Sequence, residues 1–141
     1  MAKTIDAAVT YVRATVGAID GIRNAPTGLP DNLSIYPAFV AWPGQSECYR
    51  ESSDTVRGLW SIVGQLHFSR RDLGTAAAQA TPFYRLIELA LMTDPTMGGA
   101  CDTYERILFS PLKPMLWGDN QTIGFEFTVS GIKIREDSAA T

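Results

Sequence analysis

Apolar residues recur along the chain with two different periods, and each period predicts one type of secondary structure. Near the N-terminus they recur every three or four residues over 4–20, which is the spacing of one helix face. The residues of this stripe are Ile5, Val9, Val12, Val16 and Ile19. Thr4 is a suitable N-cap, because its side-chain oxygen can accept a hydrogen bond from a free N–H of the first turn.

The same period returns between residues 81 and 92. Thr81 and Pro82 form a good N-cap and first-turn pair. The stripe that follows comprises Phe83, Leu86, Ile87, Ala90 and Leu91. Leu89 and Met92 widen it, so we expect this helix to be buried on more than one side. The preceding segment 72–80 is compatible with one or two added helical turns.

Strand-like segments fill most of the remaining chain. They cover 34–42, which contains Pro37, the long alternating segment 55–68, the segment 103–117 and the cleanly alternating segment 121–134. Pro111 and Pro114 are three residues apart, so their missing N–H groups would face opposite sides of one strand. The segment that holds them must therefore bend, bulge or leave the sheet.

Turn residues separate these elements. A Pro-containing loop covers 23–33, a long polar loop covers 43–54, and Gly118, Asp119 and Asn120 form a three-residue turn. This turn closes a long C-terminal β-hairpin, after which the residues from 136 onward are expected to fray. The order of elements predicts an α+β fold in one domain, 1–141, with two helices packed on a mostly antiparallel sheet.

A glycine-containing corner follows the second helix. Asp94 and Pro95 end the helix, because the residue before proline avoids the helical region. Gly98 and Gly99 then permit positive φ angles in a tight reversal. A phosphate-binding loop would need a strand before it and a helix after it, whereas here the order is reversed and the turn contains no lysine. We therefore expect a structural corner formed by Asp94, Pro95, Thr96, Gly98, Gly99 and Asp102.

The residues that could carry chemistry are few and scattered. His67 is the only histidine, and its place on a mixed strand face predicts an ordinary surface side chain. Cys48 and Cys101 lie outside any recognisable catalytic signature and are expected to be free thiols. One histidine and two distant cysteines do not provide a zinc site. We therefore expect no catalytic residue, no metal and no cofactor, and hence no enzyme.

Composition narrows the class of partner. The net charge is −3 and only 19% of the residues are charged. Nucleic-acid binding needs clustered Lys and Arg, so this mildly acidic chain is a poor candidate for it. No apolar stretch approaches the ~20 residues of a membrane span, so we expect no membrane partner. The low charge suggests that part of the surface is hidden in an oligomer.

The corner also resembles a family motif. The stretch "DPTMGGACDT" after the second helix, the loop "LPDNLSIYPAFVAWPG" and the closing segment "QTIGFEFTVSGIKI" are similar, in order, to the tail terminator proteins of long-tailed bacteriophages. These are also called tail completion or minor tail proteins. The family pattern D/N-P-T-L-G-G-x-V/C-D is matched from Asp94 to Asp102, with Met97 in place of leucine.

The resemblance implies a structural virion protein. Such proteins form a ring, usually a hexamer, at the head-proximal end of the tail tube, stop tube growth and present a surface to head-completion or stopper proteins. It further implies that DNA only passes through the lumen, and that the protein is made in the host bacterial cytoplasm before joining the virion. The alternatives are another neck protein, such as a head–tail connector or stopper, a non-viral binding module and, more remotely, an enzyme.

Two segments are expected at the contacts of such a ring. The first is the C-terminal hairpin, because a strand rises ~3.4 Å per residue and 121–134 would outreach a compact domain. The second is the loop 43–54. The predicted interface residues are Gly118, Asp119, Asn120, Thr122, Glu126 and Thr128 in the hairpin, and Glu47, Tyr49 and Arg50 in the loop.

Overall fold

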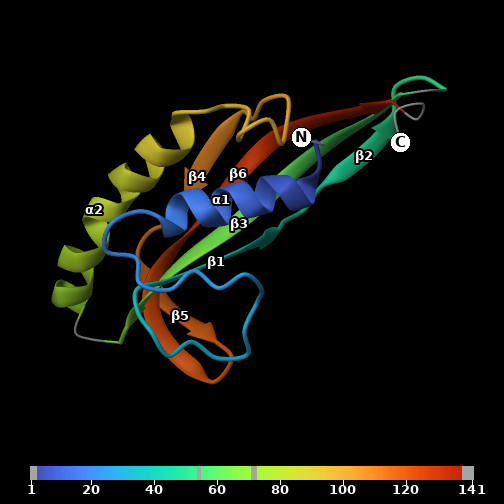
Figure 1. The fold of residues 1–141 in the computed structure, drawn as a ribbon. Helices are drawn as coiled ribbons and strands as arrows, with labels where there is room; N and C mark the ends of the chain where they lie inside the picture. Colours follow the sequence, from blue (N-terminus) through green and yellow to red (C-terminus); the bar gives the residue numbers. More distant parts are fainter. Residues whose placement is uncertain (1–2, 54, 71–72, 138–141) are drawn as a thin grey trace.

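The computed structural model describes residues 3–53, 55–70 and 73–137. Along the chain these residues form two helices and six strands (Figure 1). The elements are α1 (Ile5–Gly17), β1 (Ala38–Pro43), β2 (Glu47–Arg50), β3 (Thr55–Ser69), α2 (Leu73–Met92), β4 (Arg106–Phe109), β5 (Lys113–Trp117) and β6 (Asn120–Asp137). The backbone of β6 runs to Asp137, further than expected, and the remainder of the predicted frayed tail, 138–141, lies outside the described residues.

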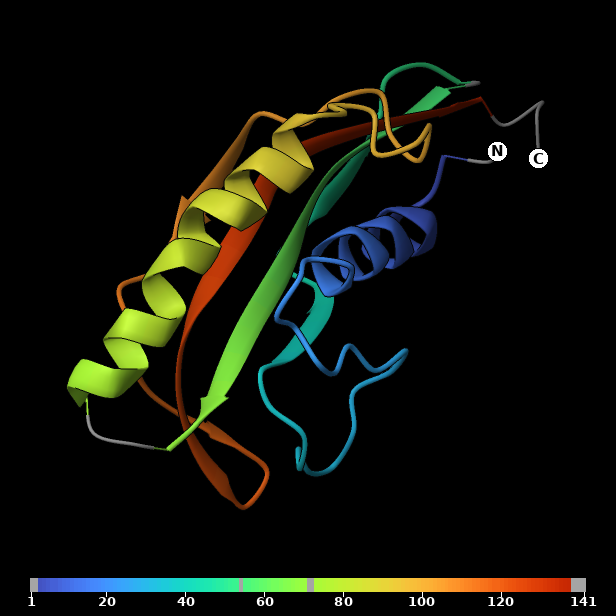
Figure 2. The same ribbon diagram turned by 60° about the vertical axis from the view of Figure 1, so that its left-hand side comes forward.

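All strand pairs are antiparallel and belong to one sheet. The order is β1–β3–β6–β4, with β2 pairing beside β1 along β3 and β5 pairing beside β4 along β6. Both helices pack on the same face of this sheet (Figure 2). The protein thus has the α+β architecture that the order of elements predicts.

The main core lies between the helices and the sheet. Phe39 of β1 and Phe127 of β6 stack with their ring centroids 5.7 Å apart and their planes 4° apart. Both rings lie over Gly64 of β3, where an added Cβ would come within 3 Å of each ring. A side chain on the central strand would therefore displace the aromatic pair that joins its two neighbours.

A smaller cluster covers one end of the opposite face. The loop before β1 returns over the sheet and places Leu33 against Ala38 and Val40, with Trp42 and Trp117 at the margin. Elsewhere this second face carries polar residues of β3 and β6, including Gln65, Glu126 and Thr128, and neither helix covers it.

The added helical turns that the sequence allowed before Thr81 are present, but the placement of Thr81 and Pro82 at the helix start is wrong. The second helix begins at Leu73, so that Pro82 lies inside it instead of in its first turn. Pro82 is exposed and Thr81 donates its hydroxyl to the carbonyl of Ala77, one turn back. A continuous buried stripe through Ala76, Ala80 and Phe83 holds the extra turns, and this packing outweighs the missing backbone donor.

Burial of this helix on several sides is also wrong. Leu86, Leu89 and Met92 are 39%, 49% and 53% exposed, and only the stripe that ends at Ile87 and Leu91 faces the core.

Two further boundaries differ. Residues 43–54 are not one long loop, because Glu47–Arg50 form β2 and pair with Val56–Leu59 of β3. The C-terminal hairpin has a two-residue turn, since Trp117 pairs directly with Asn120. The prolines behave as predicted: the extended segment breaks between β4 and β5 at Pro111, and Pro114 lies on an edge strand.

Candidate interaction surfaces

The corner after α2 is held by one carboxylate. Asp94 accepts hydrogen bonds from the backbone N–H and hydroxyl of Thr96, at 2.9 and 2.7 Å, and from the N–H of Gly98 at 2.9 Å. These bonds lower the pKa of Asp94, because they stabilise its charged form. Met97, Gly98 and Gly99 all have positive φ, at 53°, 67° and 89°. The N–H groups that a phosphate would need are thus engaged within the corner.

The far end of the corner is tied to the last strand. Asp102 accepts the backbone N–H of Arg135 and pairs with Lys3, while its own N–H donates to the carbonyl of Lys133 at 2.8 Å. Gly131 lies nearby with a φ of 68°, where β6 changes register against β3. The corner therefore joins the end of α2 to β6 close to the register shift between β6 and β3, and its purely structural role stays a prediction.

The hairpin tip packs on its own domain. Trp117 donates its indole N–H to the carbonyl of Pro30 at 2.8 Å, and the amide of Asn120 donates to the carbonyl of Leu33. Gly118 has a φ of 58° and approaches the carbonyl of Asp31 too closely for a side chain. The expectation that this tip extends beyond the domain is wrong, because the loop before β1 folds back against it. Gly118 and Asp119 remain exposed, so their role at an interface stays a prediction.

A buried polar chain crosses the second face of the sheet. Glu126 accepts from the amide of Gln65 at 2.8 Å, which orients the amide oxygen toward Nε2 of His67 at 2.9 Å. The imidazole Nδ1 lies 2.6 Å from the hydroxyl of Thr122. Since the amide oxygen can only accept, Nε2 carries a proton. Burial lowers the pKa of His67 and so favours the neutral ring, in which Nδ1 accepts from the hydroxyl of Thr122.

This row of hydrogen-bonded side chains corrects the predictions that His67 and Thr122 lie on an exposed surface. His67 is 0% exposed and Thr122 is 1% exposed, so neither lies on an accessible strand surface. The alternation along the strands suggested an exposed face, but Trp117 and the loop before β1 cover this end of it. Trp117 packs edge-on against the imidazole. Burial lowers the pKa of His67 from 6.5 to about 4. Glu126 and Thr128 are half-buried, and Glu126 is engaged with Gln65.

The hydroxyl of Thr122 contacts the imidazole, and Thr122 is 1% exposed although it borders the groove described below. The thiol of Cys101 is also buried, since this residue is 1% exposed. Burial, together with the nearby carboxylates of Asp102 and Asp94, raises the pKa of Cys101 to about 11. Cys48 is exposed on β2. Among the residues that the structure describes, no three His, Cys, Asp or Glu side chains come close enough to hold a metal ion.

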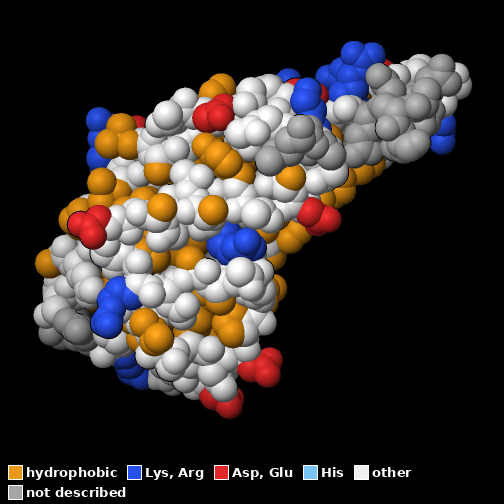
Figure 3. All heavy atoms as spheres, in the orientation of Figure 1, with side chains coloured by type: hydrophobic (Ala, Val, Ile, Leu, Met, Phe, Trp, Pro, Cys, Tyr) orange, Lys and Arg blue, Asp and Glu red, His pale blue; other side chains and the backbone are white. Residues whose placement is uncertain are grey.

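Three strand segments project past the helices at one end of the sheet, and we call this projection the arm. It consists of β2, residues 55–59 of β3 and residues 133–137 of β6. Both ribbon views show it extending past the helices, and Lys and Arg side chains gather near its end (Figures 1–3). Glu51 pairs with Arg57 and Arg135, which joins the turn of the arm to both long strands. The predicted contact residues Glu47, Tyr49 and Arg50 are all exposed on the arm.

An apolar groove lies beside the β5–β6 hairpin. It has a volume of about 700 Å³ and is lined by Arg70, Leu112, Pro114, Met115, Leu116, Gln121, Thr122 and Ile123. Leu116 is 66% exposed, and among the described residues of the lining Arg70 is the charged one. Sequence reasoning did not find this groove, because its walls come from residues up to 53 positions apart that only the pairing of β5 with β6 brings to the end of β3.

Neither the models of known protein families nor the curated proteins give a match to this chain. No helix in the described part of the chain combines the length and apolar character needed to cross a membrane.

Proposed function

We propose that this protein is a structural assembly protein of a bacteriophage tail, similar to tail terminators. In this proposal several copies, six in the family it resembles, form a ring on the last layer of the tail tube. The ring stops tube growth and offers its other side to a head-completion or stopper protein. The protein has no catalytic role in this proposal.

The observation that carries the proposal is the arm. Its strands pair with one another but extend away from the helices, and Tyr49 is 45% exposed on it. Ile134 of the arm belongs to the core, but all four residues of β2 are exposed, and a neighbouring subunit can cover them. The exposed leucines on α2, β4 and β5 add apolar surface that association would remove from water.

The sheet face without helices is the natural candidate for the lumen. Its accessible part carries Gln65, Glu126 and Thr128, which are polar or acidic. An acidic group such as Glu126 on a lumen wall repels passing DNA and so helps to keep it from sticking. This assignment leaves the helices on the outside of the ring.

The mass of the purified protein in solution, alone and with the tail tube protein of the same phage, tests the proposal. We expect a closed oligomer that binds tube ends and limits tube length under the electron microscope. Tubes that grow to the same irregular lengths with and without the protein would contradict it. Binding to a portal or head protein without any effect on tubes would favour a connector or stopper instead.

A further inference from the structure

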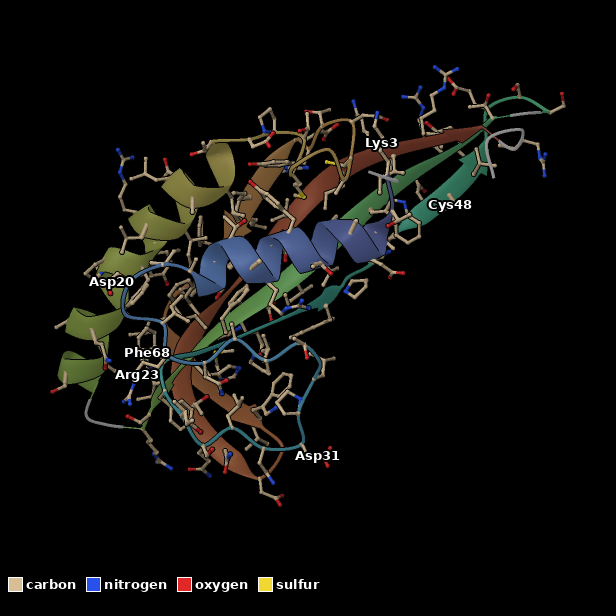
Figure 4. The ribbon with its side chains drawn as sticks, viewed as in Figure 1. Lys3, Asp20, Arg23, Asp31, Cys48 and Phe68 are labelled. Carbon is tan, nitrogen blue, oxygen red and sulfur yellow. The ribbon has the colours of Figure 1, made fainter. Side chains whose placement is uncertain are left out.

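The groove and the arm lie at opposite ends of one molecule. Figure 4 places Cys48 of β2 on the arm, and Asp31, which borders the β5–β6 hairpin, at the other end. A single copy therefore cannot bring its own arm to its own groove. Two different patches at opposite ends are what a head-to-tail contact between identical subunits requires, and such contacts close into rings when the rotation between neighbours permits.

We propose that the arm of one copy docks in the groove of a second copy, with Tyr49 among the apolar side chains and Glu47 opposite Arg70. This inference rests on the proposed ring and identifies the contact that builds it. Tyr49 and Glu47 are two residues apart on β2, so they project from the same face of the strand.

Two side chains of the arm, Tyr49 and Glu47, complement the groove, although the end of the arm also carries Arg50. The groove offers Met115 and Leu116 as an apolar wall, and of its described lining residues Arg70 carries the charge. The arm offers an aromatic side chain, the type of residue that most often anchors an interface from a pocket. Among the described residues neither Glu47 nor Arg70 has an ion-pair partner, whereas Glu51 is already paired.

The contact is made by side chains and not by adding the arm as a further strand. A strand added to β5 would need donors along its free edge. In the alternating ladder of a two-residue hairpin, Pro114 and Leu116 are the residues whose backbone groups face outward from β6. Pro114 has no N–H, so this edge cannot form a regular ladder with an incoming strand.

Charge reversal tests the docking. The variants Glu47→Arg and Arg70→Glu are compared with wild type and with the double variant by measuring oligomer mass against protein concentration. We expect each single variant to dissociate at a concentration about tenfold higher, because it places like charges together, and the double variant to recover most of this loss. Arg85→Glu and Glu88→Arg on the exposed face of α2 are matched controls that should behave as wild type. Melting curves confirm that each variant is folded.

Cross-linking gives a second, independent measurement. Cys48 projects from the face of β2 opposite Tyr49, so the linker must pass the edge of this strand. With Leu116→Cys, a bis-maleimide with a spacer of that length should join the groove of one copy to the native Cys48 of the next and give a ladder of covalent oligomers. Leu89 on α2 is also exposed, at 49% against 66% for Leu116, and Leu89→Cys should give none.

The outcomes separate this inference from the proposed function. A wild-type oligomer that is unaffected by both reversals and is not joined through Leu116→Cys would overturn the docking while leaving a ring intact. A wild-type protein that stays monomeric at every concentration, and on tube ends, would overturn both. Single reversals that dissociate the oligomer without recovery in the double variant would also exclude the Glu47–Arg70 pairing.

Discussion

Replacing His67 by glutamine should make the free energy of unfolding depend less on pH below neutrality. The unfolded chain binds a proton at this imidazole below about pH 6.5, whereas burial lowers the pKa of His67 in the folded protein to about 4. Between these values unfolding takes up a proton, so the free energy of unfolding falls as the pH falls. The stability that the neutral His67 contributes is fully present above the pKa of the unfolded chain and is lost once the pH is below the pKa of the folded protein.

The size of the effect follows from the shift. A difference of about 2.5 pKa units at 1.36 kcal/mol each gives about 3 kcal/mol in total, of which about 2 kcal/mol is lost between about pH 7.5 and pH 5. That interval lies above the range in which ordinary carboxylates titrate. The loss is a large fraction of the 5–15 kcal/mol typical of a small domain.

Urea unfolding of wild type and His67→Gln at several pH values from about 7.5 to 5 measures this term. The variant is less stable at neutral pH, since Thr122 and Gln65 lose a partner, but its stability should change little with pH. The difference between the two proteins should shrink by about 2 kcal/mol toward pH 5. Parallel pH profiles would show that burial does not lower the pKa of His67 and that the buried imidazole is not held neutral.

Three further predictions concern local structure. Gly99→Ala should lower the free energy of unfolding by about 1–2 kcal/mol through its positive φ alone, because space is open around an added Cβ, whereas Gly28→Ala, with open space and no positive φ, should not; equal melting temperatures for the two would contradict the strain argument. In the folded protein a maleimide should label one of the two thiols, Cys48, and denaturant should expose the second; mass spectrometry that finds two labels on the native protein would show that the corner opens. Asn120→Ala should cost about 1 kcal/mol by freeing the hairpin tip, while the neighbouring exposed Asp119→Ala should be neutral in the same unfolding assay.

The sequence by itself determined which segments form regular structure and where the chain must turn. The stripes of α1 and the second half of α2, the alternation of β3 and β6, and the corner at Gly98 and Gly99 all follow from local rules. Period, capping and permitted φ angles depend on neighbouring residues, so they can be read without knowing the fold.

Only the tertiary structure decided which polar side chains are buried and how far α2 extends before Pro82. His67 and Thr122 sit in polar positions of their strands, yet the loop before β1 and Trp117 cover them, and no local pattern records which loop returns over which face. Pro82 reads as a helix start, but an Ala-rich stripe continues before it because the sheet is there to bury that stripe.

The arm shows the same limit. Residues 47–50 are polar and lie between turn residues, so by themselves they favour a loop. They become a strand because β3 is long enough to offer them a partner, and β6 supports β3 on its other edge. Strand pairing joins residues distant in sequence, and the energy that fixes it exists only when both partners are in place.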